Sequence, residues 1–228
     1  MEMNATVDRL KRLSRDQYGV FTVEQAAEVG IDEAALARLR EAELLQRAAV
    51  GVYKVQGVEE DHGEGAFALW LTLDPTTSPS DRVPPRCGVL SHASAALWLD
   101  PLSFDGANLT VTVPPGINLT ARAAVNAGWI NIHEAELPAT DWFLHHGVPV
   151  TTPARTVMDL LDEHGNHDET SVGRMLNGMH RAGVVDFQDL AARLDDYAKR
   201  EEYGDGAKLV RLLSEAARPV GPPMPESA

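Results

Sequence analysis

Acidic and histidine side chains gather in the segment LDEHGNHDET, residues 161–170. Carboxylate oxygens and imidazole nitrogens are ligands that divalent metal ions accept, so the segment has the composition of a metal site. A metal site also requires its ligands to converge on one point, and neighbouring acids along a loop rarely all do so. We therefore interpret residues 161–170 as a solvated loop between two helices and predict no metal and no other cofactor.

Two pairs of neighbouring residues have the side-chain types of nucleophilic catalysis or proton transfer, Ser91–His92 and His145–His146. On a helix, adjacent side chains point about 100° apart, so Ser91 and His92 should not hydrogen-bond as a nucleophile and its base. The second pair ends a predicted strand, where a structural histidine is the commoner case. We interpret both pairs as structural.

The sequence patterns of nucleotide and nuclease sites are absent or incomplete. No glycine is followed directly by lysine, which excludes a P-loop. The pattern Gly63-x-Gly65-x-x-Ala68 has no strand before it, which argues against a dinucleotide site. None of the lysines has an acid two residues before it, the arrangement common in restriction-type nucleases. We predict that the chain is not an enzyme.

The stretch FTVEQAAEVGIDEAALARL, residues 21–39, could instead bind DNA through arginine side chains in and next to it. This stretch predicts two short helices joined by a tight glycine turn, which is how helix-turn-helix proteins present a helix to the major groove. The exposed face of the second helix is centred on Ala37 and includes Ala34, with Arg38 and Arg40 on its flanks. Arginine bonds guanine bidentately and alanine suits the thymine methyl, so we expect these residues to contact bases.

Further basic residues are expected to contact phosphates. Such contacts position the DNA-binding helix on the duplex but do not select the base sequence. These basic residues are Arg9, Arg12 and Arg15 on a first helix and Arg47 and Lys54 on a hairpin. So few cations should bind DNA weakly at physiological salt. We therefore expect pairing of two copies on an operator with inverted repeats in double-stranded DNA.

The sequence patterns of three helices and a hairpin, which would position these side chains, predict a winged helix-turn-helix domain over residues 1–60. The first helix is expected at about residues 5–16, and the second at roughly 23–29, with Thr22 and Gln25 as a capping box. Asp32 caps the third helix, whose leucines face inward. A β-hairpin is predicted in LLQRAAVGVYKV.

Residues 61–228 predict an acidic, mixed α/β domain that ends in helices, so the expected fold class is α+β. Linkers are expected at residues 58–65 and 74–85, helices at AFALWLTL and SHASAALWL, and strands at NLTVTV, WINIHEA, DWFLHH and VPVTT. The chain should be helical from about residue 152, with helices at about 169–180, 187–200 and 206–217. The tail, residues 218–228, is predicted to be disordered.

The segment VPVTTPARTVMDLL is the most distinctive one outside the N-terminal domain. Thr152 followed by Pro153 is a strong helix start, and Arg155 can form an ion pair with Asp159 one turn later. A helix cap with an internal ion pair is the favoured interpretation. The alternative is that Thr151, Thr152 and Arg155 contact a partner or an anion.

Charge is distributed unevenly along the chain, whose net charge is −14. Residues 1–57 hold eight Lys and Arg against nine Asp and Glu, which leaves a net of −13 for the rest. The acidic part should repel nucleic acid, whereas the nearly neutral N-terminal part need not. The single cysteine and the lack of an export signal or a long apolar run predict a cytoplasmic protein with no membrane partner.

The segments GVFTVEQAAEVGIDEAALARLREAELLQRAAVGVYKV, LSHASAALW, NLTVTVP and HHGVPVTTPARTVMDL follow one another in this order. Over about residues 9–161 the sequence resembles the AbiEi-type antitoxins of bacterial type IV toxin–antitoxin systems, which act in phage defence. This resemblance implies an N-terminal winged helix that represses transcription of its own operon. It also implies a C-terminal domain that opposes a nucleotidyltransferase toxin, directly or indirectly.

We therefore predict an antitoxin that acts as a sequence-specific DNA-binding autorepressor and opposes a cognate nucleotidyltransferase toxin. The alternative is a protein-interaction module that uses the winged helix and the acidic surface to bind a basic partner.

Overall fold

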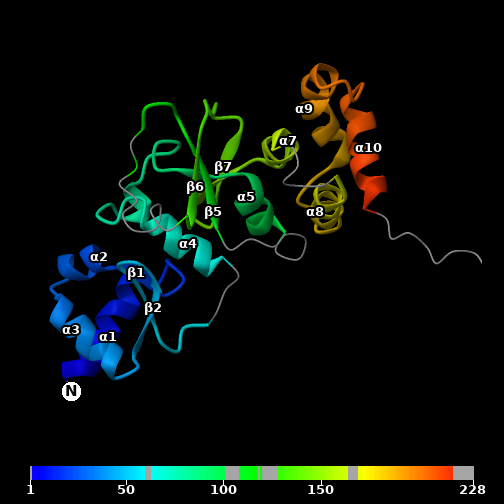
Figure 1. The fold of residues 1–228 in the computed structure, drawn as a ribbon. Helices are drawn as coiled ribbons and strands as arrows, with labels where there is room; N and C mark the ends of the chain where they lie inside the picture. The colour runs from blue at the N-terminus through cyan, green and yellow to red at the C-terminus, as the bar shows by residue number, and fades with distance from the viewer. Residues whose placement is uncertain are drawn as a thin grey trace, which may run out of the picture.

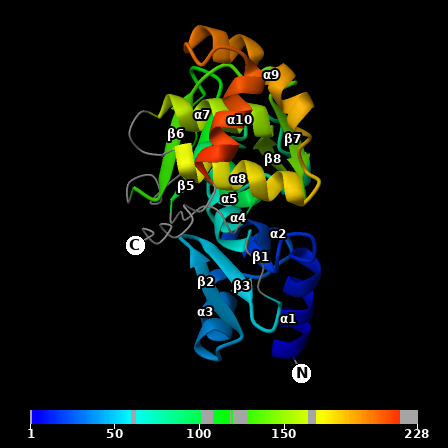
Figure 2. The same ribbon diagram turned by 90° about the vertical axis from the view of Figure 1, so that its right-hand side faces the viewer.

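The computed structural model describes residues 2–59, 63–100, 108–117, 119, 128–163 and 169–217. An N-terminal head lies below a central sheet, and a group of helices lies beside one face of that sheet (Figures 1 and 2). The tail that the sequence predicts to be disordered, residues 218–228, is outside the described residues.

The head contains both helices and a small antiparallel sheet. Its elements are α1 (Glu2–Leu13), β1 (Val20–Thr22), α2 (Val23–Glu28), α3 (Glu33–Glu41), β2 (Leu45–Ala49) and β3 (Val52–Val55). The strands pair in the order β1-β3-β2. This arrangement is consistent with the predicted winged helix-turn-helix, with β2 and β3 as the predicted hairpin. The sequence prediction lacked β1.

Local capping interactions fix where the helices of the head begin. Thr22 Oγ1 accepts a hydrogen bond from the Gln25 amide, and Gln25 Oε1 accepts one from the Thr22 amide, each at 3.0 Å. The predicted capping box is therefore confirmed. The carboxylate of Asp32 accepts from the Ala35 amide at 2.7 Å and begins α3 as predicted.

The central part consists of a mixed sheet and the helices that cover it. Its elements are α4 (Glu64–Leu71), the 3₁₀ helix η1 (Pro79–Asp81), β4 (Val89–Leu90), α5 (His92–Leu99), β5 (Leu109–Val113), β6 (Ile130–Glu134), β7 (Trp142–His145) and β8 (Val148–Thr151). The strand order is β6-β5-β4-β8-β7, with parallel pairing between β5 and β6 and between β4 and β8. The α+β fold class is confirmed, and β4 is an addition to the predicted strands.

Helix α4 joins the head to the sheet through one continuous apolar core. Val20 and Val52 of the head lie in the same buried cluster as Phe67 and Trp70 of α4. The Tyr18 ring meets the Phe67 ring edge-on, with their centroids 5.2 Å apart. Figure 1 shows α4 between the head and the sheet. The head is therefore packed against the rest of the chain and is not merely tethered to it.

The segment 74–85, which the sequence predicts to be a linker, is an ordered loop built around a buried arginine. The Arg82 guanidinium donates hydrogen bonds to the backbone carbonyls of Trp70, Leu71, Asp74 and Thr77. It also lies 4.2 Å from the centroid of the Trp70 ring. Burial lowers the pKa of Arg82 to about 10, so the side chain stays charged at neutral pH.

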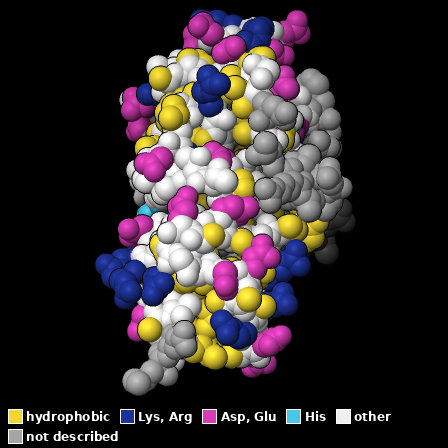
Figure 3. Space-filling model, turned by 90° about the vertical axis from the view of Figure 1, so that its left-hand side faces the viewer, with side chains coloured by type: hydrophobic (Ala, Val, Ile, Leu, Met, Phe, Trp, Pro, Cys, Tyr) yellow, Lys and Arg dark blue, Asp and Glu magenta, His cyan; other side chains and the backbone are white. Residues whose placement is uncertain are grey.

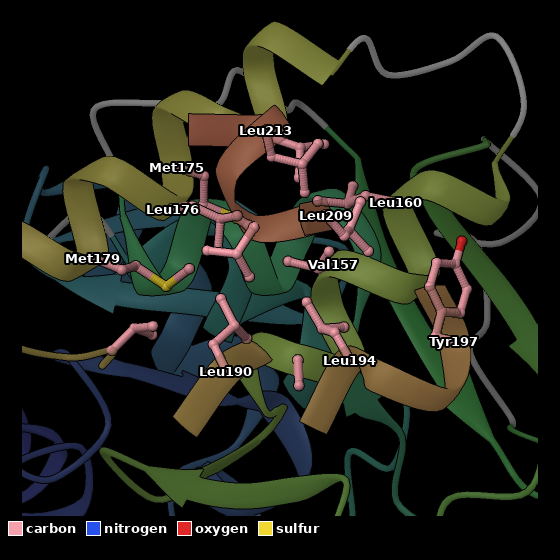
Figure 4. Packing of buried hydrophobic residues seen from close by; sticks show 14 of the residues in the cluster. Val157, Leu160, Met175, Leu176, Met179, Leu190, Leu194, Tyr197, Leu209 and Leu213 are labelled. Carbon is pink, nitrogen blue, oxygen red and sulfur yellow. The ribbon is translucent and has the colours of Figure 1, made fainter. Parts of the chain in front are cut away.

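The helical end comprises α7 (Pro153–Asp162), α8 (Glu169–Arg181), α9 (Phe187–Arg200) and α10 (Gly206–Ala216). Helix α9 has the predicted bounds, and α8 and α10 differ from the prediction by one residue at one end. Leucine, methionine and valine side chains from these helices point toward one another in a shared core (Figure 4). A Cβ atom at Gly173 would collide with the Leu213 carbonyl, and one at Gly206 with the Ala191 carbonyl. These glycines allow the helix backbones to touch.

The loop around Arg82 gives a test of stability. Arg82→Ala removes a buried cation and leaves several carbonyl groups without their donor, so we expect a loss of about 2–4 kcal/mol. Urea unfolding followed by circular dichroism measures this loss. Arg86→Ala, an exposed neighbour, is the matched control and should change the free energy of unfolding by less than about 0.5 kcal/mol. Equal effects of the two substitutions would contradict the assigned role.

A second test uses the hydrogen bond from the Trp98 indole N–H to His145 Nδ1, 2.9 Å long. Burial lowers the pKa of His145, and the neighbouring His146 lowers it further. The unfolded chain therefore takes up a proton at a higher pH than the folded chain, and stability falls as the pH drops through this range. We expect His145→Asn, which keeps an acceptor at every pH, to lose less stability than the wild type between about pH 7.5 and about pH 5.5. Urea midpoints at both pH values check this, and equal losses would disprove it.

Candidate nucleic-acid interface

Helix α3 presents one face to the core of the head and the other to solvent. Leu36 and Leu39 are each 2% exposed and pack in a cluster with Leu10 and Phe21. All the residues predicted to contact bases are exposed: Ala34, Ala37, Arg38 and Arg40. The structure therefore leaves this helix face accessible to a partner.

The charge on α3 follows the direction of the helix dipole. Glu33 lies in the first turn, whereas Arg38 and Arg40 lie in the last turn, where a cation is favoured. Figure 3 shows Lys and Arg side chains on both flanks of the head, with apolar and acidic side chains between them. The surface is mixed in charge and is not a continuous basic patch.

The predicted phosphate contacts on α1 are all exposed, although one of them also has a structural partner. Arg12 and Arg15 extend from the helix and its end into solvent. The Arg9 guanidinium donates to the Val29 carbonyl at 3.0 Å, which ties α1 to the end of α2. On the hairpin, Arg47 is exposed, and its Nε donates to the Ala49 carbonyl at 3.3 Å.

Lys54 differs from these residues because it is buried, which contradicts the predicted phosphate contact. Its side chain is buried, and Nζ forms an ion pair with a carboxylate oxygen of Glu64 in α4. A buried ammonium held by a carboxylate cannot reach a phosphate without losing that partner. Lys54 therefore joins the head to α4 and is not exposed for the phosphate contact that the sequence predicted.

The residues predicted as a partner or anion contact are engaged within the fold. Thr151 is fully buried, and its hydroxyl lies 2.8 Å from that of Thr156, so it cannot touch a partner. Thr152 Oγ1 accepts from the Arg155 amide as the helix cap. Burial raises the pKa of Asp159 to about 6, and the cation of Arg155 opposes this rise.

The Arg155 guanidinium already has two carboxylate partners. Its Nε donates to Asp159 at 2.7 Å and its Nη1 to Asp141 at 3.3 Å. Because two carboxylates offset its single positive charge, the site does not attract an anion. These contacts support the interpretation as a helix cap with an internal ion pair.

The Ser91–His92 pair behaves differently from the prediction. Ser91 Oγ and His92 Nδ1 are 2.9 Å apart, within hydrogen-bonding distance. The expectation failed because Ser91 is extended and His92, the first residue of α5, has φ of 51°, so the backbone of this pair lacks regular helical geometry. Ser91 is fully buried and cannot be reached by a substrate.

One group of residues was missed by the sequence interpretation. His92, His133 and Glu163 each place a ligand atom within 4.8 Å of the others. They come from α5, β6 and the end of α7, far apart in the sequence, so no local spacing indicated them. Of the segment 161–170, residues 164–168 lie outside the described residues.

Among the helices that the structure describes, none combines the length and apolar character needed to cross a membrane.

Comparison with known proteins gives a family match for the head. Residues 8–56 match the family model described as "Transcriptional regulator, AbiEi antitoxin". None of the curated proteins matches the chain. Among solved structures, the RV2827C protein from Mycobacterium tuberculosis is similar, with a TM-score of 0.46 and 17% identity over 97% of this chain and 84% of that chain.

The matched residues span the second half of α1, together with β1, α2, α3 and the hairpin. Over residues 8–56, the chain is thus similar to the AbiEi antitoxin family of transcriptional regulators.

Proposed function

We propose that this protein is an antitoxin that represses its own operon by placing α3 in the major groove of a specific operator. Its acidic remainder opposes a nucleotidyltransferase toxin. The observation that carries the proposal is the exposed face of α3, with Arg38 and Arg40 beside the small residues Ala34 and Ala37, inside the segment that matches the regulator family.

The chemistry of this face suits selective reading of DNA. Two guanidinium groups can bond guanine edges, and the alanines allow close approach to the groove. Arg12, Arg15 and Arg47 are exposed on neighbouring elements and can contact phosphates. Such contacts orient the head, whereas α3 selects the sequence.

The acidic body limits binding to non-specific DNA. Most of the net charge of −14 lies outside the head, so the chain as a whole is repelled by a polyanion. Net binding then depends on the base contacts and on the pairing of two heads on inverted half-sites. A strongly basic head would bind DNA of any sequence, and repression would lose its selectivity.

The proposed opposition to a toxin is supported by the family match of the head and by the acidic character of the remaining residues. A rival function is a docking module in which the same surfaces bind a basic protein partner. The mixed charge of the head in Figure 3 is compatible with either role, so DNA binding itself has to be measured.

One prediction of this proposal concerns α3. Arg38→Ala combined with Arg40→Ala should weaken binding of the full chain to the DNA upstream of its gene by about 30-fold or more, because each of the two lost base contacts costs about 1–3 kcal/mol. Binding to a scrambled duplex should change much less. Electrophoretic mobility shifts with both duplexes measure the two affinities.

A matched control is Arg193→Ala combined with Arg211→Ala, which removes the same charge from exposed positions of α9 and α10. This control should bind the upstream DNA like the wild type. Unchanged binding by the α3 variant would overturn the assignment of the recognition helix. No binding by the wild type to any duplex at low salt would favour the protein-docking function.

Another prediction of this proposal concerns the contacts between the head and DNA phosphates. The logarithm of the binding constant should fall with the logarithm of salt concentration, and Arg12→Ala with Arg15→Ala should reduce this slope by about 2. Lys54→Gln should leave the slope unchanged, because Lys54 is paired with Glu64 inside the protein. Fluorescence anisotropy at several salt concentrations gives the slopes. A reduced slope for Lys54→Gln would show that this lysine does reach the DNA.

A further inference from the structure

The sheet brings together three potential metal ligands that the DNA-binding function does not use. His92 begins α5, His133 lies in β6, and Glu163 follows the last residue of α7. One ligand atom from each lies within 4.8 Å of the other two. Imidazole nitrogen together with carboxylate oxygen suits Zn²⁺ and similar transition metals better than Mg²⁺ or Ca²⁺.

The distances suit a small tetrahedral ion. His133 Nε2 and Glu163 Oε1 are 3.5 Å apart. Two ligands that bind one Zn²⁺ ion at its usual bond lengths lie about 3.4 Å from each other. The rings of His92 and His133 are stacked with their centroids 4.0 Å apart and their planes 24° apart, so the two imidazoles are neighbours, and one ring has to rotate before both nitrogens point at the same ion.

Pairing of the strands determines where these histidines lie. Thr112 of β5 is directly opposite His133 of β6 in the parallel register. The Thr112 hydroxyl donates to Ser91 Oγ at 2.8 Å, and Ser91 Oγ is in turn 2.9 Å from His92 Nδ1. A histidine that binds a metal through one ring nitrogen characteristically donates its other N–H to an oxygen. Ser91 is placed to accept that bond.

The backbone at His92 is also unusual. Its φ of 51° lies in the left-handed region, which an L-residue adopts at a cost, and its side chain is 7% exposed. Such strain is retained where a side chain must point in a particular direction. Here the unusual conformation directs the imidazole toward His133 and Ser91.

We propose that His92, His133 and Glu163 bind one Zn²⁺ ion, which links α5, β6 and α7. Three protein ligands leave a fourth tetrahedral position for water. Ser91 and Thr112 act as positioning residues that orient the His92 ring. The site lies in the central part of the chain and is independent of the proposed DNA contact.

The test uses the full chain after treatment with a chelator and removal of the chelator. Co²⁺, which replaces Zn²⁺ and gives visible absorption bands when tetrahedral, is titrated and then displaced with Zn²⁺. We expect one equivalent of Co²⁺ per chain and complete displacement by Zn²⁺. His133→Ala and Glu163→Gln, which change partly exposed side chains, should each weaken binding by roughly 100-fold.

His146→Ala and Glu134→Gln are matched controls at exposed positions outside the cluster and should bind like the wild type. Thr112→Val keeps the side-chain shape but removes the donor to Ser91, and it should weaken binding by about tenfold. Circular dichroism checks that every variant is folded. The proposal is overturned if the wild type binds neither metal, or if His133→Ala binds Co²⁺ as tightly as the wild type.

Discussion

The buried junction between the head and α4 determines how the rest of the protein can work. Val20 and Val52 share one apolar core with Phe67, and the Lys54–Glu64 ion pair connects β3 to α4. Breaking such a pair leaves an uncompensated charge in a poorly solvated place, which costs several kcal/mol. The head is therefore held against the sheet, and whatever α3 contacts must accommodate the acidic body as well.

Because this junction fixes the head, the uneven charge along the chain affects what the head can bind. A head on a flexible tether could approach DNA while the acidic part stayed at a distance. With the head fixed, the proposed contact with DNA would bring the net charge of the remainder close to the duplex, and only well-placed contacts could overcome the repulsion. The small number of exposed arginines on α1, α3 and the hairpin is consistent with such a balance.

Local chemistry made much of the fold predictable. Thr22 with Gln25, Asp32 and Pro153 each begin a helix through interactions with residues a few positions away, so the sequence itself contains the signal. Apolar periodicity likewise placed the last helices to within one residue. The exposure of Arg38 and Arg40 followed from the same periodicity, because Leu36 and Leu39 face the core.

The remaining features depend on contacts between distant segments, which no local pattern encodes. Lys54 and Arg47 look alike in the hairpin sequence, and only the packing of α4 buries the first and leaves the second exposed. Proline and serine in residues 74–85 indicated a linker, whereas Arg82 organises that loop by bonding carbonyls of the preceding helix. His92, His133 and Glu163 meet only because the strands pair in a particular register.

The close backbone contacts at Gly173 and Gly206 have a consequence for recognition at the helical end. Because α10 touches α8 and α9 without intervening side chains, these helices cannot slide past one another without opening the core. The outer surface that these helices form is thus preorganised. A protein that docks there would freeze little additional motion, so more of the contact energy would remain as affinity.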